Sequence, residues 1–434
     1  MKRALVLVAM SAVLAAACTS DTSSTTPTGG TGGGGGPVQI EIWHGQSQTA
    51  KQAMDDLVAR YNDSQDGVEV IVSSGGVTTD EMLAKVTTSI AAGTYPDIAY
   101  MYGSWGGNLA TSPKIADLTE EIQDPAVAWD DFWPAASQTA TVDGKVIGFP
   151  AIIDNLSVAY NKDVFDAAGV DYPSPDWTWE DFRETAAALT DPEQNIYGVN
   201  YPVTGSEDTV WRFWPFLWQA GGEVLNEDGT EATFNSQAGV EALTLWQQMA
   251  VTDGSVYLDP TDEKAEPLFT SGHLAMFVTG PWEVPVFEEN NMNWGDQVLP
   301  SYDGVTHETV SGPDLWAVFD NGQPNVDASV DFLTWFSEPE QQLEWMTAAG
   351  SLPIRTSIQD DPGYQEYLDT YPGIQAMADN LANALHTRPA VTQYPRISKS
   401  TGDAIAAVLL GEMEPQAALD QAVEQANALL VIPG

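Results

Sequence analysis

Near the start of its folded part, the chain changes between two spacings of apolar residues. Gln39–Trp43 (QIEIW) alternates apolar and polar residues as a strand does, and Met54, Leu57, Val58 and Tyr61 then recur at the spacing of an amphipathic helix. The elements expected next are a strand at 68–72, a helix at 81–92 that Gly93 ends, and a third strand from residue 96. This βαβαβ order predicts an α/β fold with a parallel sheet.

Ligand contacts are expected at the carboxyl ends of these strands, where open α/β sheets bind their ligands. The loop after the first strand contributes His44, Gln46 and Ser47 as candidates. The loop Tyr102–Trp105 after the third strand contributes Trp105, a large flat ring.

A later stretch, Phe269–Trp282 (FTSGHLAMFVTGPW), has the pattern of a helix end, a turn at Gly272 and a short buried strand. The apolar run Leu274–Thr279 stops at glycine, and Trp282 follows directly. The ring of Trp282 is therefore predicted where a strand gives way to a loop, which is a usual place for a ligand site.

Aromatic residues are dense between positions 177 and 218. Thr178 has the pattern of a helix cap, and Trp179 behind it is predicted to be a core residue. Three rings crowd into Trp211–Trp214, so one ring can pack inward while another stacks on the face of a sugar. The residue pattern leaves open which of these rings belong to the core.

The N-terminus has the composition of an export signal. Lys2 and Arg3 precede an apolar segment that ends in small residues before Cys18, the only cysteine of the chain. This arrangement is similar to a bacterial lipobox, although Ala15 stands where leucine is usual. We therefore expect a signal peptide at 1–17, a lipidated Cys18, and a disordered Ser/Thr/Gly tether at 18–37.

Charge and length narrow the function classes. The chain has 434 residues, enough for two domains, with 15 basic and 62 acidic residues and a formal net charge of −47. A chain this acidic is poorly suited to bind nucleic acid. It lacks a Walker loop, G-x-S-x-G and H-E-x-x-H, and its four histidines are scattered, so no cofactor and no metal site are expected.

Five motifs occur in an order that resembles one family. They are G-x-x-P-D-I at 93–98, G-K-x-x-x-x-P at 144–150 followed by Y-N-K at 160–162, F-x-x-G-x-x-A-M-x-x-x-G-P-W at 269–282, S-G-P-D-L-W-A-V at 311–318 and G-S-L-P-I-R at 350–355. Together they resemble extracellular solute-binding protein family 1 of ABC importers, which includes maltose- and trehalose-binding proteins. The resemblance spans about 39–430.

The resemblance implies a two-lobed periplasmic-binding-protein fold, type II-like, in which each lobe is a mainly parallel sheet flanked by helices. Three crossings would form the hinge between the lobes. Lobe 1 would consist of 38–149 plus about 312–355, and lobe 2 of 150–311 plus about 356–434.

The resemblance also implies site residues. Trp282 and Trp211 match positions at which the family faces its sugar. The crossings add Asp154, Gly312, Asp314, Trp316 and Arg355 as candidate contacts. Two alternatives stay open from the residues alone, because Asp154 is equally a surface carboxylate and Arg355 equally a member of an ordinary ion pair.

The expected function is a receptor and not an enzyme. It would capture a neutral mono- to oligosaccharide in the interlobe cleft and deliver it to the permease subunits of the importer, as a monomer anchored to the outer face of the cytoplasmic membrane. The alternative is an exported carbohydrate-active enzyme such as a glycoside hydrolase, because a chain with this many carboxylates always offers a possible catalytic pair. A structural lipoprotein or adhesin is a third class, which needs no tryptophan-lined cleft.

Overall fold

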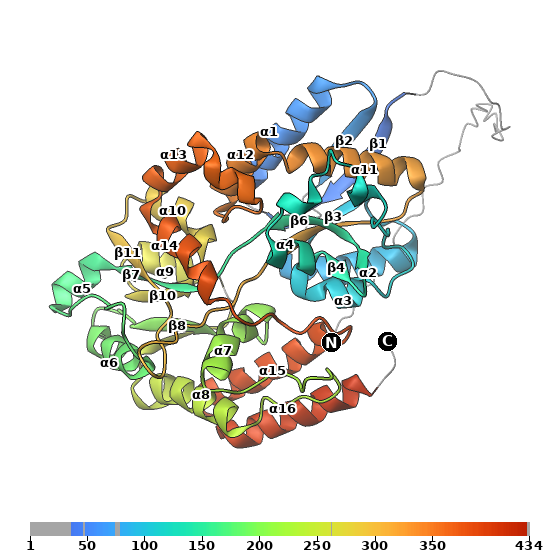
Figure 1. Ribbon diagram of the computed structural model, residues 1–434. Coiled ribbons are helices and arrows are strands. Elements are labelled where there is room, and N and C mark those ends of the chain that lie inside the picture. Colours follow the sequence, from blue (N-terminus) through green and yellow to red (C-terminus); the bar gives the residue numbers. More distant parts are fainter. Residues whose placement is uncertain (1–35, 47, 74–78, 262, 432–434) are drawn as a thin grey trace, which may run out of the picture. The chain divides into compact units, whose positions relative to one another are not determined.

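The computed structural model describes residues 36–46, 48–73, 79–261 and 263–431 (Figure 1). The predicted signal segment and the tether up to residue 35, with Cys18, lie outside the described residues, and so does Ser47. From Pro37 onward the chain forms one compact unit.

A five-stranded sheet contains the strands predicted near the start of the chain. Its order is β2 (Val68–Ser73), β1 (Val38–Trp43), β3 (Ile98–Tyr102), β12 (Asp314–Val318) and β6 (Gly148–Ile152). β1 pairs in parallel with both β2 and β3, through the helices α1 (Gln48–Ser64) and α2 (Thr79–Ala92), so the βαβαβ prediction is confirmed. β12 runs antiparallel to β3 and β6.

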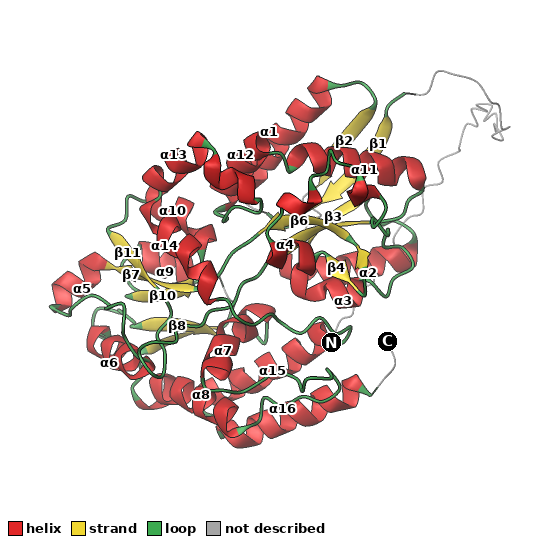
Figure 2. Cartoon of the chain, in the orientation of Figure 1, coloured by secondary structure: helices red, strands yellow, loops and turns green. Residues whose placement is uncertain are grey.

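Both faces of this sheet are buried at β3 and β12, because alternate side chains of these two strands enter different cores. On β3, Tyr100 packs into one core while Ala99 and Met101 pack into another, and on β12 the side chain of Trp316 enters the first core and that of Leu315 the second. The first core includes side chains of α1, α11 (Gln323–Phe336) and α12 (Pro339–Ala349), and the second includes those of α2 and α3 (Gly106–Leu109). In Figure 2 the strands accordingly lie between helices.

A three-stranded sheet has the order β10 (Met276–Thr279), β7 (Ser157–Asn161), β11 (Trp294–Gln297). Both of its pairings are antiparallel, so the prediction of a mainly parallel sheet is wrong here. A short apolar run is buried equally well in either direction, and its sequence does not encode strand direction. β8 (Val199–Pro202) and β9 (Val256–Asp259) form a separate parallel pair.

The next core lies among helices, three of which contribute tryptophan side chains to it. Thr178 caps α6 (Trp179–Leu189) in a reciprocal capping box with Asp181, as predicted. Trp179 is 2% exposed and stacks on Phe216 at 3.7 Å between ring centroids, which confirms its prediction as a core residue. The other helices of this core are α7 (Glu207–Gln219), α8 (Gln237–Gln247), α15 (Tyr394–Leu409) and α16 (Pro415–Leu430).

The remaining elements are short. They are α4 (Pro134–Thr139), β4 (Thr141–Val142), β5 (Lys145–Val146), α5 (Lys162–Ala168), α9 (Ala265–Thr270), α10 (Val284–Glu289), α13 (Pro362–Thr370) and α14 (Pro372–Asn380), together with the π-helical segment Gln248–Thr252 and several 3-10 turns.

The three segments predicted as crossings run side by side. Ile153 bridges to Leu352, and Asn155 bridges to Ser311. They connect the five-stranded sheet and its helices to the elements around β7 and β10. The predicted lobe boundaries stay a prediction, and the core of the five-stranded sheet also takes in α13, which lies beyond position 355.

Candidate functional site

One cavity collects most of the predicted contacts. It has a volume of about 350 Å³, and its lining residues come from elements on both sides of the crossing segments, such as α1 and α7. Six of the predicted site residues line it: Gln46, Asp154, Trp211, Trp282, Gly312 and Asp314. The other lining residues were not predicted from the sequence, and the polar or aromatic ones among them that matter most are Tyr100, Tyr102, Glu207, Asp208, Glu266, Glu283 and Arg388.

Gly312 allows the crossing segment to touch the ring of Trp211. A Cβ atom at Gly312 would lie 2.0 Å from the edge of that ring and 2.8 Å from Oδ1 of Asp154. The Gly312 N–H donates to the same Asp154 oxygen at 3.0 Å. A side chain at position 312 would therefore displace both cavity residues.

Asp154 and Asp314 contribute two carboxyl groups to the lining of the cavity. The hydroxyl of Tyr100 donates to Oδ2 of Asp314 at 2.7 Å. Burial, and then the charge of Asp314, raise the pKa of Asp154 well above its usual range, while Arg388 and the Gly312 N–H act in the opposite direction. The shift favours the protonated form of Asp154, in which the carboxyl group can both donate and accept a hydrogen bond.

Trp282 and Glu283 extend into the cavity from the 3-10 turn Pro281–Glu283, which follows β10 as predicted. Glu283 is partly exposed, yet the packing around its carboxylate, and then the charge of Glu266, raise its pKa to about 8. Arg212 acts in the opposite direction. Glu283 therefore holds its proton most of the time at neutral pH.

Arg388 and Glu207 form a buried ion pair in the lining of the cavity. Nη1 of Arg388 donates to Oε1 of Glu207 at 2.9 Å, and the two side chains are 6% and 8% exposed. The guanidinium also lies 4.2 Å from the ring centroid of Trp211, so Arg388 covers that ring. Trp211 itself is only 6% exposed. Of the two predicted stacking rings, Trp282 is the one that is more open to a ligand.

Three predicted contacts lie elsewhere. His44 is fully buried, where its ring accepts from the N–H of Gln46, and burial lowers its pKa to about 4. Trp105 belongs to the second core of the five-stranded sheet, and its neighbour Tyr102 lines the cavity instead. Trp316 points to the opposite side of β12 from Leu315 and packs against Trp345. The apolar surface of these rings is used in packing.

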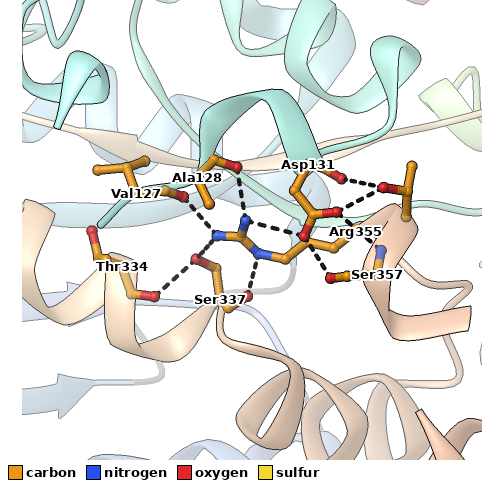
Figure 3. Close-up of polar contacts among 8 residues, drawn as sticks. Val127, Ala128, Asp131, Thr334, Ser337, Arg355 and Ser357 are labelled. Carbon is orange, nitrogen blue, oxygen red and sulfur yellow. Dashed lines mark hydrogen bonds and ion pairs between the residues drawn. The ribbon is translucent and has the colours of Figure 1, made fainter. Parts of the chain in front are cut away.

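Arg355 is also held away from the cavity (Figure 3). Its guanidinium donates to the carbonyl oxygens of Val127 and Ala128, both at 3.0 Å, and to the hydroxyl of Ser337 at 2.7 Å. Asp131 lies 3.7 Å away as an ion-pair partner. Of the two alternatives for Arg355, a ligand contact or a structural ion pair, the structure favours the structural one, because each terminal nitrogen of the guanidinium already has an acceptor.

Within the described ranges, no group of three or more His, Cys, Asp or Glu side chains is placed to hold a metal ion. None of the helices found there is long and apolar enough to span a bilayer.

The fold and this cavity define a two-lobed solute-binding protein. A model of the bacterial extracellular solute-binding protein family matches residues 56–371. The chain belongs to this family of ABC importer components, as its motifs predicted.

Individual relatives cover nearly the whole chain. The sn-glycerol-3-phosphate-binding periplasmic protein UgpB of Escherichia coli (strain K12) is 24% identical over 90% of this chain and 92% of its own length. The cyclic alpha-maltosyl-1,6-maltose binding protein from Arthrobacter globiformis is 31% identical, with a TM-score of 0.75 over 91% of this chain and 99% of its own. An ABC substrate-binding protein from Listeria monocytogenes, solved in complex with cycloalternan, is 26% identical, with a TM-score of 0.83 over 92% of this chain and 100% of its own.

Proposed function

We propose that this chain captures a neutral mono- to oligosaccharide in the cavity and delivers it to the permease of an ABC importer. The observation that carries the proposal is the lining of the cavity, to which Trp282 contributes an aromatic ring and Asp154 and Asp314 contribute carboxyl groups. A flat ring suits the C–H face of a sugar, and carboxyl groups suit its hydroxyls.

The charge of the lining argues against a phosphate ligand such as that named for UgpB. Arg388 is the one basic residue among the described lining residues, and it already donates to Glu207. A phosphate would meet several carboxylates and no guanidinium that is held ready for it. The two sugar-binding relatives are therefore the better guide to ligand class.

Calorimetric titration of a panel tests the proposal. The panel contains glucose, maltose, maltotriose, cycloalternan and sn-glycerol-3-phosphate. We expect saturable binding of at least one saccharide and none of sn-glycerol-3-phosphate. Binding of the phosphate alone would contradict the proposal. Chromatography of the same samples after long incubation separates a receptor from a glycoside hydrolase, because a hydrolase would shorten the saccharide.

We further propose that the predicted lobes close on the ligand and that Cys18 carries a lipid anchor. Closure would join Trp282 of lobe 2 and Asp314 of lobe 1 around one sugar and shift the equilibrium between open and closed forms. The anchor rests on the sequence before Cys18. Cys18→Ser should release the protein from the membrane fraction into the medium, and equal retention of both proteins would exclude the anchor.

A further inference from the structure

The cavity has a large excess of acidic over basic side chains. Among the described residues, its lining contains one guanidinium, that of Arg388, and six carboxyl groups: Asp154, Glu207, Asp208, Glu266, Glu283 and Asp314. Arg388 is used by Glu207 and by the ring of Trp211. Surface carboxylates are expected in so acidic a protein, but carboxylates gathered around a cavity lose hydration and are costly unless a partner arrives.

The excess is concentrated beside Trp282. The carboxylate of Glu283 follows Trp282 in the chain and is influenced by the charges of Glu266 and Asp208. Arg212, the basic group nearby, pairs with Asp208 and donates through Nε to the carbonyl oxygen of Val278 at 2.9 Å. A partly exposed tryptophan ring beside carboxylates is an arrangement that attracts an ammonium group, through both the ring face and the charge.

We infer that this site binds a carbohydrate bearing a basic amino group more tightly than its neutral counterpart, with the ammonium held between Glu283 and Trp282. The inference rests on the proposed function, since it assumes that this cavity is the sugar site. The neutral hydroxyls of such a ligand would still meet Asp154 and Asp314.

Proton release provides an independent signature. Because the pKa of Glu283 is raised to about 8, this group is largely protonated in the empty cavity near pH 7. An arriving ammonium stabilises the carboxylate, so Glu283 loses its proton to the buffer on binding. A neutral sugar has no charge to offer and should release fewer protons.

Matched sugar pairs test the inference by calorimetry. The probes are D-glucosamine against D-glucose, D-galactosamine against D-galactose, and the unacetylated chitosan dimer against cellobiose, each titrated at pH 6.5 in two buffers of different ionisation enthalpy. We expect at least one amino sugar to bind about tenfold more tightly than its neutral partner, with a measured enthalpy that depends on the buffer.

Two variants assign the effect to the cavity. Glu283→Gln keeps the shape and removes the charge, and it should reduce the ratio of the two dissociation constants by about fivefold or more. Glu289→Gln, an exposed carboxylate at the end of α10, is the matched control and should keep the ratio of the wild type. A preference that survives Glu283→Gln would reflect general attraction to the acidic surface and would overturn the inference.

The outcomes separate the two proposals. Neutral sugars that bind as tightly as their amino partners, or more tightly, would overturn the inference while supporting the proposed function. Failure of every sugar, with binding of sn-glycerol-3-phosphate, would overturn both.

Discussion

Replacing Arg388 with methionine should destabilise the fold through the charge that it leaves behind. The side chain of Glu207 is 8% exposed, so its carboxylate is poorly screened by water. In the variant it would keep the hydroxyl donors of Tyr394, at 3.0 Å, and Ser398. Removing one partner of a buried ion pair costs about 3–5 kcal/mol, and the two remaining donors place the expected loss near the lower end of that range, at about 3 kcal/mol. The lost contact with the Trp211 ring adds to this loss.

Urea unfolding at pH 7 measures this loss, and a double-mutant cycle assigns it. Glu207→Gln in the Arg388→Met background removes the uncompensated charge, so the double variant should be less destabilised than the sum of the two single variants, with a coupling of about 1–3 kcal/mol. Arg396→Met is the control, because this arginine is exposed on α15 and should change stability by about 0.5 kcal/mol or less. If the losses in unfolding free energy of the two single variants add in the double variant, or if Arg388→Met costs less than about 1 kcal/mol, Arg388 and Glu207 do not act as a buried ion pair.

Three further changes probe the cavity and its supports. Trp282→Ala should weaken sugar binding about tenfold or more with little loss of stability. Trp179→Ala should instead lower the free energy of unfolding by about 3–5 kcal/mol, while the folded fraction keeps its affinity. Titration and unfolding of the same samples distinguish these results, and the reverse pattern would show that the sugar does not bind in this cavity. Gly312→Ala should weaken binding about tenfold or more by displacing Trp211 and Asp154, and unchanged affinity would show that the close approach has no importance for the ligand. Because the pKa of Glu283 is raised, the folded state holds a proton that the unfolded chain has lost, so this group lowers stability as pH rises from about 4.5 towards 8. Glu283→Gln should therefore become progressively more stable than the wild type across that interval. Parallel curves of stability against pH for the two proteins would contradict this.

Much of the fold follows from local sequence signals. The strands β1, β2 and β3 appear within a few residues of their apolar runs, and the capping residue Thr178 sets the start of α6. Strand direction in the three-stranded sheet could not be predicted, because the sequence of a strand of four or five residues does not encode which way its neighbours run.

Part of the cavity lining was predictable from residues that lie on a crossing segment or directly follow a strand, although His44, Trp316 and Arg355 meet the same condition and lie elsewhere. Asp154, Gly312, Asp314 and Trp282 satisfy that condition, and all four line the cavity. Arg388 does not, because it lies in a loop between α14 and α15 that packing alone brings to Trp211.

Two lining residues were missed from the sequence, and two expected contacts lie elsewhere, in each case for a local reason. Glu207 and Asp208 look like acidic residues that stabilise the first turn of α7, so their place in the cavity wall had no separate signal. Arg355 and Trp316 were selected for their residue type near a crossing, but the side of the strand and the nearby carbonyl groups decide where such side chains point.

The position of the bound saccharide in a crystal structure of the complex tests the central claim most directly. The ligand should be the tightest binder of the calorimetric panel. We predict electron density for a sugar ring against Trp282, with a hydroxyl within hydrogen-bonding distance of Asp154 or Asp314. Density outside this cavity, for example in the polar hollow lined by Asn161, Asn290 and Asn293, would contradict the account.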